Sequence, residues 1–385
     1  MTNRTRLATA AALVPLAVLA AACSSSPSSS TPSTSSSKPA AMMGAALPSA
    51  PAKTPESLTE TGSTLLFPLI SAWAQAYQKL YVQSSGLPTV TITTGATGSG
   101  TGLADAATGT VDIGASDAYL SPTTKSETPT LLNIALAISA QQVNYNVPGL
   151  KTGLKLDGTV LAEIYEGKIT NWNDAAIKAL NPGVSLPNMK IVPLHRADSS
   201  GDTFIFTSYL NAQDPSAWPS SNVSTSATFT AVPGSLGEQG NGGMVAGCAA
   251  TKGCIAYIGV SYLSQTQAAG LGQAALKNGS GNFEQPTPAA ISAAAAAVTG
   301  KTPPSETLSM INDSAPTGYP IVNYEYAIVN TKQSNGTVAE DMRAFLHWTV
   351  HSGQSATQFL DAVDFQPLPA AVVTLSDNQI AKIGA

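Results

Sequence analysis

The sequence is poor in charged side chains, which make up only 11% of its 385 residues. Its 18 lysines and arginines are outnumbered by 23 aspartates and glutamates, which gives a formal net charge of −5. The basic residues form no stripe along the sequence, and this argues against a nucleic-acid partner. An anion would have to be held by local geometry, because the overall field of an acidic protein repels it.

Cysteine and histidine are also scarce, with three of each. Cys248 and Cys254 have no further metal-ligating residues around them, so we interpret them as a short-loop disulfide of an exported protein. His347 and His351 have the i,i+4 spacing that can hold a metal on a helix, but the sequence offers no evident third ligand. We therefore predict no metal site and no cofactor, and expect these histidines on an exposed face.

The sequence also lacks the nucleophile motif of a serine hydrolase. No Gly-x-Ser-x-Gly elbow is present, although His195, Asp198 and Ser200 include the residue types of a catalytic triad. These residues are too close along one turn for a base to face a nucleophile in the usual geometry. We therefore assign no catalytic residue.

The N-terminus carries an apolar run. Two arginines precede residues 7–22, which are alanine-rich, interrupted by Pro15 and too short for a permanent membrane helix. This pattern is typical of a secretory signal peptide, here residues 1–22. Cys23 follows three alanines as in a bacterial lipobox, so we predict that it is lipidated. Simple secretion is the alternative, because Ala20 stands where a large aliphatic residue is usual.

Residues 23–57 comprise the lipidated cysteine and a tether rich in Ser, Thr and Pro. A segment with almost no large apolar side chain cannot offset its ordering entropy by burial, so we expect it to be disordered. With more than one acyl chain, such as palmitate, on the cysteine, it would hold the protein near a membrane. The rest of the chain is longer than one hydrophobic core usually supports, which predicts two lobes.

Beyond the tether, strand-like and helix-like segments alternate. We expect a strand followed by a turn at residues 60–65, and strands at residues 90–94, 111–115, 131–145, 191–194, 254–258 and 321–330. We expect helices at residues 67–81, 161–165, 174–180, 203–210, 289–298, 338–351 and 374–383, and one that ends at residue 108. Residues 212–243 are expected to be mostly loop. This alternation predicts α/β lobes with mainly parallel sheets.

Three turns rich in glycine and serine stand at strand–helix junctions, around Ser63–Thr64, Ser99 and Ser200–Gly201. The N–H groups at the start of a helix are unpaired and carry partial positive charge, so they can hold an anion. In open α/β sheets such turns gather at the carboxyl ends of the strands. Arg196 adds a fork of donors suited to phosphate or carboxylate. Together these features predict a buried oxyanion site.

Four stretches carry a family resemblance, in order: residues 62–65, 98–100, 112–117 and 196–202. They resemble the phosphate-binding proteins of the high-affinity phosphate ABC importer, the PstS family of substrate-binding lipoproteins. The resemblance covers nearly all of residues 58–385. The lipid-anchored form also shares the Cys248/Cys254 pair and the Ser/Pro-rich tether.

The resemblance implies a periplasmic-binding-protein fold, in which two α/β lobes joined by hinge strands close on phosphate. Lobe I would combine residues 58–145 with 321–385, and lobe II would span residues 146–320. The implied phosphate-binding residues are Ser63, Thr64, Leu65, Ser99, Asp117, Arg196, Ser200, Gly201 and Asp202. Asp117 would accept the proton that phosphate keeps near neutral pH and sulfate lacks. A site built around one ligand proton can reject the analogue without it by about 10⁴- to 10⁵-fold.

Two aspartates near Arg196 have separate expected roles. Asp198 is expected to pair with Arg196 and hold its fork in place. Asp202 departs from the family, because many members carry threonine there. Its carboxylate would either accept a second ligand proton and favour monobasic phosphate, or point elsewhere while its N–H faces the ligand. The sequence leaves both alternatives open.

Simpler structural roles are the alternatives for the same residues. Asp117 could cap a helix, as an aspartate after a strand often does. Ser200 could be a cap or turn serine. Arg196 could form a surface ion pair with Asp198 or Asp202.

The expected function is that of an extracytoplasmic receptor, held at the cell membrane by its lipid anchor alone. It would capture inorganic phosphate and deliver it to an ABC permease and its ATPase subunit, as a monomer and without catalysing a reaction. The alternatives are a phosphate-ester hydrolase on the same scaffold, or a surface adhesin or antigen with incidental anion binding.

Overall fold

The computed structural model describes residues 47–84, 89–150, 152–226, 229, 232–333 and 335–384. The predicted signal peptide, Cys23 and the tether up to residue 46 lie outside these residues. Among the helices of the described part, none is both long enough and apolar enough to cross a membrane. The predicted lipid anchor therefore stays a prediction.

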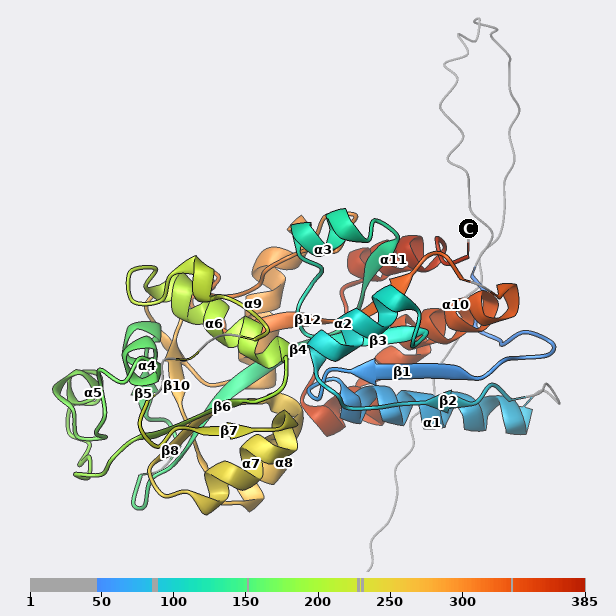
Figure 1. Cartoon of the computed structure of the whole chain (residues 1–385). Coiled ribbons are helices and arrows are strands. Elements are labelled where there is room, and N and C mark those ends of the chain that lie inside the picture. The colour runs from blue at the N-terminus through green and yellow to red at the C-terminus, as the bar shows by residue number, and fades with distance from the viewer. Residues whose placement is uncertain are drawn as a thin grey trace, which may run out of the picture. The chain divides into compact units, whose positions relative to one another are not determined.

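Strands and helices alternate along the described chain, as the sequence predicts (Figure 1). The strands are β1 (Leu58–Gly62), β2 (Ile92–Thr93), β3 (Ile113–Ser116), β4 (Leu131–Asn146), β5 (Lys155–Leu156), β6 (Val192–Arg196), β7 (Leu236–Glu238), β8 (Cys254–Gly259), β9 (Gly272–Gln273), β10 (Ala275–Lys277), β11 (Phe283–Glu284) and β12 (Val322–Asn330). The helices are α1 (Phe67–Ser84), α2 (Ser99–Thr108), α3 (Pro122–Glu127), α4 (Gly158–Tyr165), α5 (Ala175–Leu180), α6 (Gly201–Gln213), α7 (Gly240–Ala250), α8 (Leu263–Ala268), α9 (Pro288–Val298), α10 (Gly336–Val350) and α11 (Ala370–Ile380). Each predicted element is present, with ends that differ by a few residues, while α3, α7 and α8 lie where no helix was expected.

The strands form one long sheet in the order β2-β1-β3-β12-β4-β8-β6-β7, with β9 also paired to β4. A smaller sheet has the order β11-β10-β5. Strand β4 is long enough to belong to both halves of the main sheet: residues 131–140 pair with β12, and residues 141–146 pair with β8. The apolar run in which the sequence predicted strands and a crossing is therefore one continuous strand, which carries the chain from one half to the other.

The main sheet is mixed. Strand β1 pairs in parallel with β2 and β3, and β6 pairs in parallel with β7 and β8. The central pairings β3–β12, β12–β4 and β4–β8 are antiparallel. The α/β fold is confirmed, but the expected predominance of parallel pairing holds only at the two flanks, because β4 and β12 run against their neighbours where the halves join.

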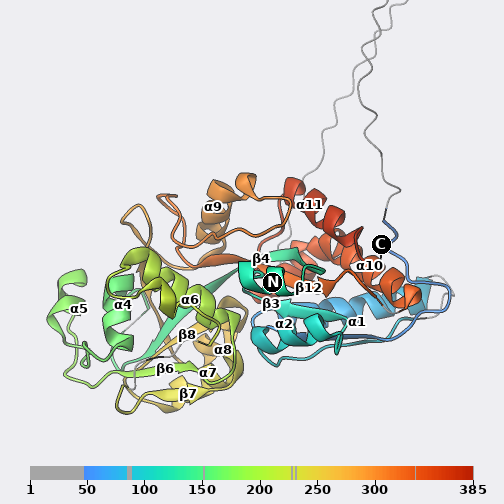
Figure 2. The same ribbon diagram turned by 45° about the horizontal axis from the view of Figure 1, so that its top comes forward.

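The two ends of the described chain meet in one half of the sheet. In Figures 1 and 2 the blue elements α1 and β1 lie beside the red helix α10, whereas the green and yellow elements from α4 to α8 lie in the other half. Trp73 in α1 donates its Nε1–H to the carbonyl oxygen of Gly353 at 2.9 Å, and the ring of Tyr77 packs against Phe345. This arrangement agrees with the predicted discontinuous lobe I, whose boundaries stay a prediction.

The last part of the predicted tether is ordered. The backbone N–H groups of Ala52 and Glu56 donate to the two carboxylate oxygens of Asp341 in α10, at 2.8 and 2.9 Å. The hydroxyls of Tyr77 and Tyr81 in α1 both donate to the carbonyl oxygen of Ser49. The expectation of a disordered tether is therefore wrong for residues 47–57, because polar groups of the folded unit bind their backbone.

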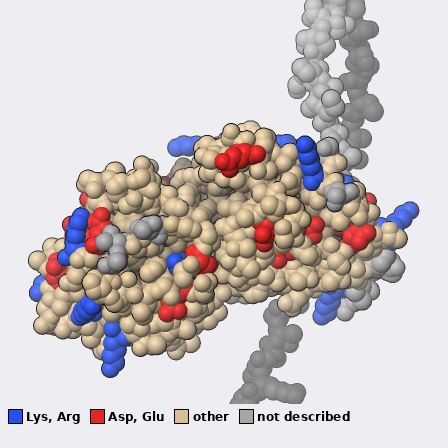
Figure 3. Space-filling model, in the orientation of Figure 1, with Lys and Arg blue, Asp and Glu red and all other residues tan. Residues whose placement is uncertain are grey.

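The predicted disulfide is present between Cys248 in α7 and Cys254, the first residue of β8. It closes a short loop and holds the end of α7 against the start of the strand. The surface agrees with the composition: on the face in Figure 3, basic and acidic side chains stand in small scattered groups and form no continuous basic stripe.

Glu60 in β1 has a buried carboxyl group with few hydrogen bonds to offset the cost of its burial. It is 3% exposed, its Oε1 has no hydrogen-bond partner among the described residues, and its Oε2 accepts a long bond of 3.4 Å from the N–H of Gly95. Burial raises the pKa of Glu60 from 4.5 to about 8, against the lowering effect of the Gly95 bond. Ionisation of this carboxyl must therefore destabilise the folded state.

The Glu60→Gln variant should lose part of the pH dependence of stability. Between pH 4.5 and about 8 the folded wild type keeps the Glu60 proton that the unfolded chain releases, so its free energy of unfolding falls as pH rises. Glutamine carries no such charge, so the variant should gain roughly 5 kcal/mol over wild type across this window of about 3.5 pKa units, at about 1.4 kcal/mol per unit. Urea unfolding on both sides of the window measures the difference. Glu340→Gln, at an exposed position of α10, controls for net charge, and parallel pH curves for wild type and Glu60→Gln would contradict the prediction.

Candidate functional site

The three predicted turns and the end of β3 meet around Asp117. Ser63, in the turn between β1 and α1, donates its hydroxyl to Asp117 Oδ1. Ser99, the first residue of α2, donates its hydroxyl to Asp117 Oδ2 at 3.3 Å. A Cβ atom on Gly201 would stand 2.5 Å from Asp117 Oδ2 and 2.6 Å from Ser99 Oγ, so only glycine fits there. The structure thus brings the predicted residues of all three turns to one carboxylate.

Asp117 is fully enclosed and is not a helix cap. It is 2% exposed, and the next helix, α3, is capped by Ser121, so the N-cap alternative is wrong. Burial raises the pKa of Asp117 above its usual range, against hydrogen bonds from Glu325, Ser63 and Ser99 and the charge of Arg196. A buried carboxylate that is surrounded by donors can serve as an acceptor for a ligand proton.

Glu325 in β12 is a partner of Asp117 that the sequence did not reveal. It is fully buried, and both burial and the neighbouring charge of Asp117 raise its pKa well above the usual range. Its Oε1 accepts from Ser139 and Asn323, while its Oε2 finds no donor among the described groups. An oxygen without a donor is the one expected to carry the proton. We therefore interpret Glu325 as the protonated member of the pair, which donates to Asp117.

Arg196, the last residue of β6, is held by two carboxylates. Its Nε donates to Asp198 Oδ1 at 2.7 Å, its Nη2 donates to Asp198 Oδ2, and its Nη1 donates to Asp202 Oδ2 at 2.6 Å. Burial opposes the charge on Arg196, but the hydrogen bonds and charges of both aspartates raise its pKa overall. The ion pairs with Asp198 and Asp202 that the alternative named are therefore present, but the Arg196 side chain is 1% exposed, so they are buried and not at the surface.

The guanidinium keeps donors for a ligand. It has five N–H groups, and the two aspartates use three of them. Burial raises the pKa of Asp198, but the hydrogen bonds and charge of Arg196 outweigh this effect and lower it below the usual value. The predicted role of Asp198, to hold the fork of Arg196 in place, agrees with this geometry.

Asp202 turns its carboxylate toward the protein. Oδ2 accepts from Arg196 and from Asn241 Nδ2 at 2.8 Å, and Oδ1 accepts from Gln141 Nε2 at 3.1 Å. Burial, followed by the charge of Asp117, raises the pKa of Asp202 to about 7, against the lowering effects of Arg196, Asn241 and Gln141. Together Asp198 and Asp202 hold Arg196 in an arginine clamp. This geometry favours the alternative in which the carboxylate of Asp202 belongs to the clamp and its N–H faces the ligand.

Asn241, in the first turn of α7, links the two halves of the site. Its Nδ2 donates to Thr64 Oγ1 at 2.9 Å as well as to Asp202, and its Oδ1 accepts from the N–H of Gly259 at 2.7 Å. The backbone N–H of Asn241 also donates to Thr64 Oγ1, at 3.2 Å, and because Thr64 Oγ1 accepts both bonds, its hydroxyl hydrogen can still donate to a ligand. The sequence gave no signal for Asn241, which stands in a Gly-Asn-Gly-Gly run that was expected to be loop.

The turn at residues 63–65 offers fewer donors to a ligand than the sequence predicted. The N–H of Ser63 donates to the carbonyl oxygen of Ala115 at 2.9 Å, and the N–H of Leu65 donates to Ser63 Oγ at 3.1 Å. Ser63 therefore positions Asp117 and the turn, and its backbone is not available to an anion. Of residues 63–65, Thr64 is the one that the structure leaves able to donate.

Ser200 and Gly201 start helix α6 on the other side of the site. Ser200 holds the N-cap position but makes no side-chain cap bond, and its Oγ is buried without a hydrogen-bond partner in the described part of the chain. Burial of a hydroxyl without a hydrogen-bond partner destabilises the folded protein by about 1–3 kcal/mol. The Ser200 hydroxyl lies at a helix N-terminus that favours negative charge. Ser200 is therefore the N-cap residue by position, as the cap alternative expected, but its hydroxyl makes no cap bond and is left without a partner among the described residues.

The two sides of the site are closed against each other. The N–H of Gly100 donates to the carbonyl oxygen of Ser199 at 3.0 Å. Gly98 has a φ of +95°, and a Cβ there would stand 2.6 Å from Asp198 Oδ2, so the backbone of this turn needs glycine to approach the arginine clamp. Thr64, Arg196, Ser200 and Asp117 are thus all buried near the contact between these two sides.

The residue types of a catalytic triad do not assemble. The ring of His195 packs on Phe229, Asp198 binds Arg196, and the hydroxyl of Ser200 has no described partner. Without a base on the serine, this turn has no activated nucleophile. Among the described residues, this turn therefore pairs no base with a nucleophile.

Comparison with known proteins shows the family of the chain. A family model described as the PBP superfamily domain matches residues 48–352. The phosphate-binding protein PstS of Haemophilus influenzae is 32% identical over 327 residues, which cover 84% of this chain and 92% of that protein.

Solved structures share the fold. A phosphate-binding protein from Stenotrophomonas maltophilia has a TM-score of 0.59 and 21% identity, over 84% of this chain and 93% of that one. An ABC-type phosphate transport receptor from Vibrio cholerae has a TM-score of 0.51 and 17% identity, over 81% of this chain and 100% of that one. The predicted periplasmic-binding-protein fold is confirmed.

Proposed function

Because the chain belongs to the PstS family of phosphate-binding proteins within the PBP superfamily, we propose that it is a receptor for inorganic phosphate. Its matched relatives are named as phosphate-binding proteins or a phosphate transport receptor, and not as enzymes. The function is capture of an anion between the two halves of the sheet, with no chemical step.

The observation that carries the proposal is the unpaired hydroxyl of Ser200. It is buried at the start of α6, and the adjacent residue Gly201 touches Asp117. A phosphate oxygen would satisfy this hydroxyl and the N–H groups at the helix start. The remaining N–H groups of Arg196 and the hydroxyl of Thr64 would then bind the other oxygens.

Asp117 is the group that selects phosphate over sulfate. Phosphate keeps a proton near neutral pH, and Asp117 accepts it, whereas sulfate would place lone pairs against the carboxylate. Arg196 offsets the ligand charge for either anion and does not discriminate between them. The carboxylate of Asp202 stays bound to Arg196, so Asp117 is the single carboxylate that accepts the ligand proton.

The remaining parts of the proposal concern transport. The receptor is lipidated at Cys23, lies on the extracytoplasmic face of the cell membrane, and delivers phosphate as a monomer to an ABC permease with its ATPase subunit. Support comes from the lipobox-like N-terminus and from the likeness to an ABC-type phosphate transport receptor. Closure of the two halves would be stabilised by the greater affinity of the closed state for phosphate.

Calorimetry on chain that has been unfolded and refolded to remove bound ligand tests the proposal. Phosphate should bind in saturable fashion, and sulfate at the same concentration should not. Absence of phosphate binding would overturn the proposal. Turnover of a phosphate ester would instead support the hydrolase alternative, and normal phosphate uptake in cells that lack the protein would support the adhesin or antigen alternative.

A further inference from the structure

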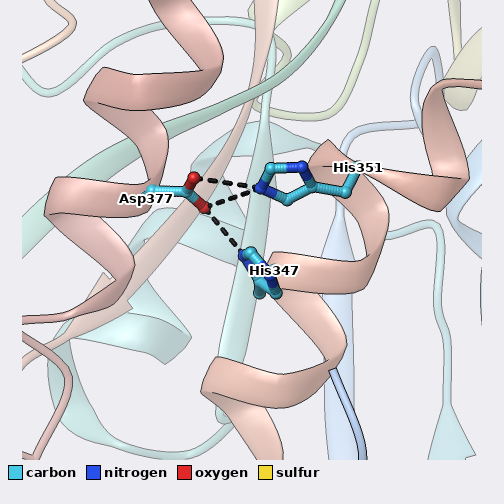
Figure 4. Close-up of side chains that lie close together, drawn as sticks. All are labelled: His347, His351 and Asp377. Carbon is cyan, nitrogen blue, oxygen red and sulfur yellow. Dashed lines mark hydrogen bonds and ion pairs between the residues drawn. The ribbon is translucent and has the colours of Figure 1, made fainter. Parts of the chain in front are cut away.

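Two histidines and an aspartate meet outside the phosphate site. His347 lies in the last turn of α10, His351 follows that helix, and Asp377 lies in α11 (Figure 4). Asp377 Oδ1 lies 2.8 Å from His347 Nδ1, and Asp377 Oδ2 lies 3.0 Å from His351 Nε2. One ligand atom from each residue falls within 4.8 Å of the others. The three side chains therefore converge on one point from two helices.

We propose that His347, His351 and Asp377 form a binding site for a first-row transition-metal dication, best suited to Zn²⁺. Imidazole nitrogens and a carboxylate oxygen are ligands that zinc accepts, whereas Ca²⁺ and Mg²⁺ prefer sites made of oxygen atoms. The sequence supplied the two histidines at i,i+4 but no third ligand. Folding brings Asp377 to them across the α10–α11 contact.

The spacing of the ligand atoms suits a tetrahedral ion. Zinc bonds of about 2.0–2.1 Å place neighbouring ligand atoms about 3.3 Å apart in a tetrahedron. Asp377 Oδ1 lies 2.8 Å from His347 Nδ1 and 3.2 Å from His351 Nε2, and both separations are slightly shorter than this edge, so small rotations of the imidazoles make room for the ion. His351 is 42% exposed at its side chain and leaves a path from solvent. Three protein ligands leave the fourth position to water.

Metal binding requires the two ring nitrogens that face Asp377 to lose their protons, either to the other nitrogen of the ring or, from a charged ring, to solvent. In the metal-free protein the nitrogens that face Asp377 donate to its carboxylate. When the ion binds, His347 Nδ1 and His351 Nε2 offer lone pairs to it, and each neutral ring carries its proton on the other nitrogen. The carboxylate then neutralises part of the charge of the ion.

The ion would cross-link the C-terminal helix to the rest of its half of the sheet. Helix α11 is already fixed to β4, because Ser376 donates its hydroxyl to the carbonyl oxygen of Ala135 at 3.0 Å. The next residue, Asp377, would be tied to α10 by the metal. The site shares no residue with the phosphate site, so its role is to stabilise this half and is independent of phosphate capture.

Titration of the untagged full chain with Co²⁺ and Zn²⁺ in phosphate-free buffer tests the proposal. Co²⁺ should bind at one site per chain and give the visible absorption of a tetrahedral ion, and Zn²⁺ should displace it. Zn²⁺ should also raise the melting temperature, and a chelator should reverse the rise. His351→Gln and Asp377→Asn should each weaken binding by at least about tenfold, because even supporting groups around a metal contribute that much.

His195→Gln is the matched control, because it removes the other histidine and leaves the cluster intact. It should bind Co²⁺ as wild type does, and the circular dichroism of all variants without metal should match wild type. Lack of saturable binding of either ion would overturn the proposal. Binding that survives both His351→Gln and Asp377→Asn would also overturn it, because the ion would then lie elsewhere.

Discussion

Arg196→Ala is expected to reduce phosphate affinity by about 100-fold or more and to destabilise the ligand-free protein as well. Charge-assisted hydrogen bonds contribute about 1.5–3 kcal/mol each, so the loss of two such bonds to the ligand accounts for the effect on affinity. The effect on stability arises because removal of the guanidinium leaves Asp198 and the fully buried Asp202 without their cation. Breaking a buried pair in this way costs about 3–5 kcal/mol.

Calorimetry with phosphate and thermal unfolding without it measure the two effects of Arg196→Ala. The loss of stability should be smaller at acid pH, because Asp202, whose pKa is already about 7, takes up a proton when its partner is absent. Arg196→Lys keeps the charge but cannot serve both carboxylates, so it should recover stability better than affinity. Arg343→Ala removes an arginine that binds Ile383 O in the C-terminal region and is the control. Phosphate affinity within about threefold of wild type would show that Arg196 is not a ligand.

Features carried by local patterns were the ones that the sequence predicted. Helix α1 begins at Phe67 as expected, because a glycine- and serine-rich turn precedes a regular apolar face. The turns at residues 63 and 99 could be assigned to one site because the carboxyl ends of parallel strands meet at one edge of a sheet. The turn at residue 200 meets them for another reason: β6 runs opposite to β1 and β3, so its carboxyl end points toward theirs where the two halves join. Arg196 and Asp198 are two residues apart, so their pairing also needed no tertiary information.

The features that the sequence missed depend on contacts between distant segments. Asn241 and Glu325 are single polar residues with distant partners. Asn241 lies 177 positions from Thr64 in the sequence, and Glu325 lies 208 positions from Asp117. No local pattern distinguishes such residues from loop or strand residues. The same holds for residues 47–57, whose composition indicates disorder until Asp341 is brought to them.

Asp117→Asn is expected to weaken phosphate binding and to narrow the preference for phosphate over sulfate by about 100-fold or more. The amide keeps an oxygen that can accept from Ser63, but its NH₂ group replaces an acceptor by a donor. Phosphate then loses the partner of its proton, and sulfate gains a hydrogen bond where it met a carboxylate. Each such reversal in a dry site contributes about 1–3 kcal/mol, and the two act in the same direction on the ratio of affinities.

Competition calorimetry with phosphate and sulfate at neutral pH measures that ratio. Asp112→Asn removes an aspartate at the opposite end of β3, where it accepts from Thr59, and controls for the change in net charge. A second variant, Glu325→Gln, separates the selective role of the Asp117 carboxylate from its contact with Glu325. Glutamine keeps a donor toward Asp117, so Glu325→Gln should retain the preference for phosphate that Asp117→Asn loses. If Asp117→Asn excludes sulfate as fully as wild type, another group accepts the proton of the ligand. Asp202 is then the remaining carboxylate that could accept it.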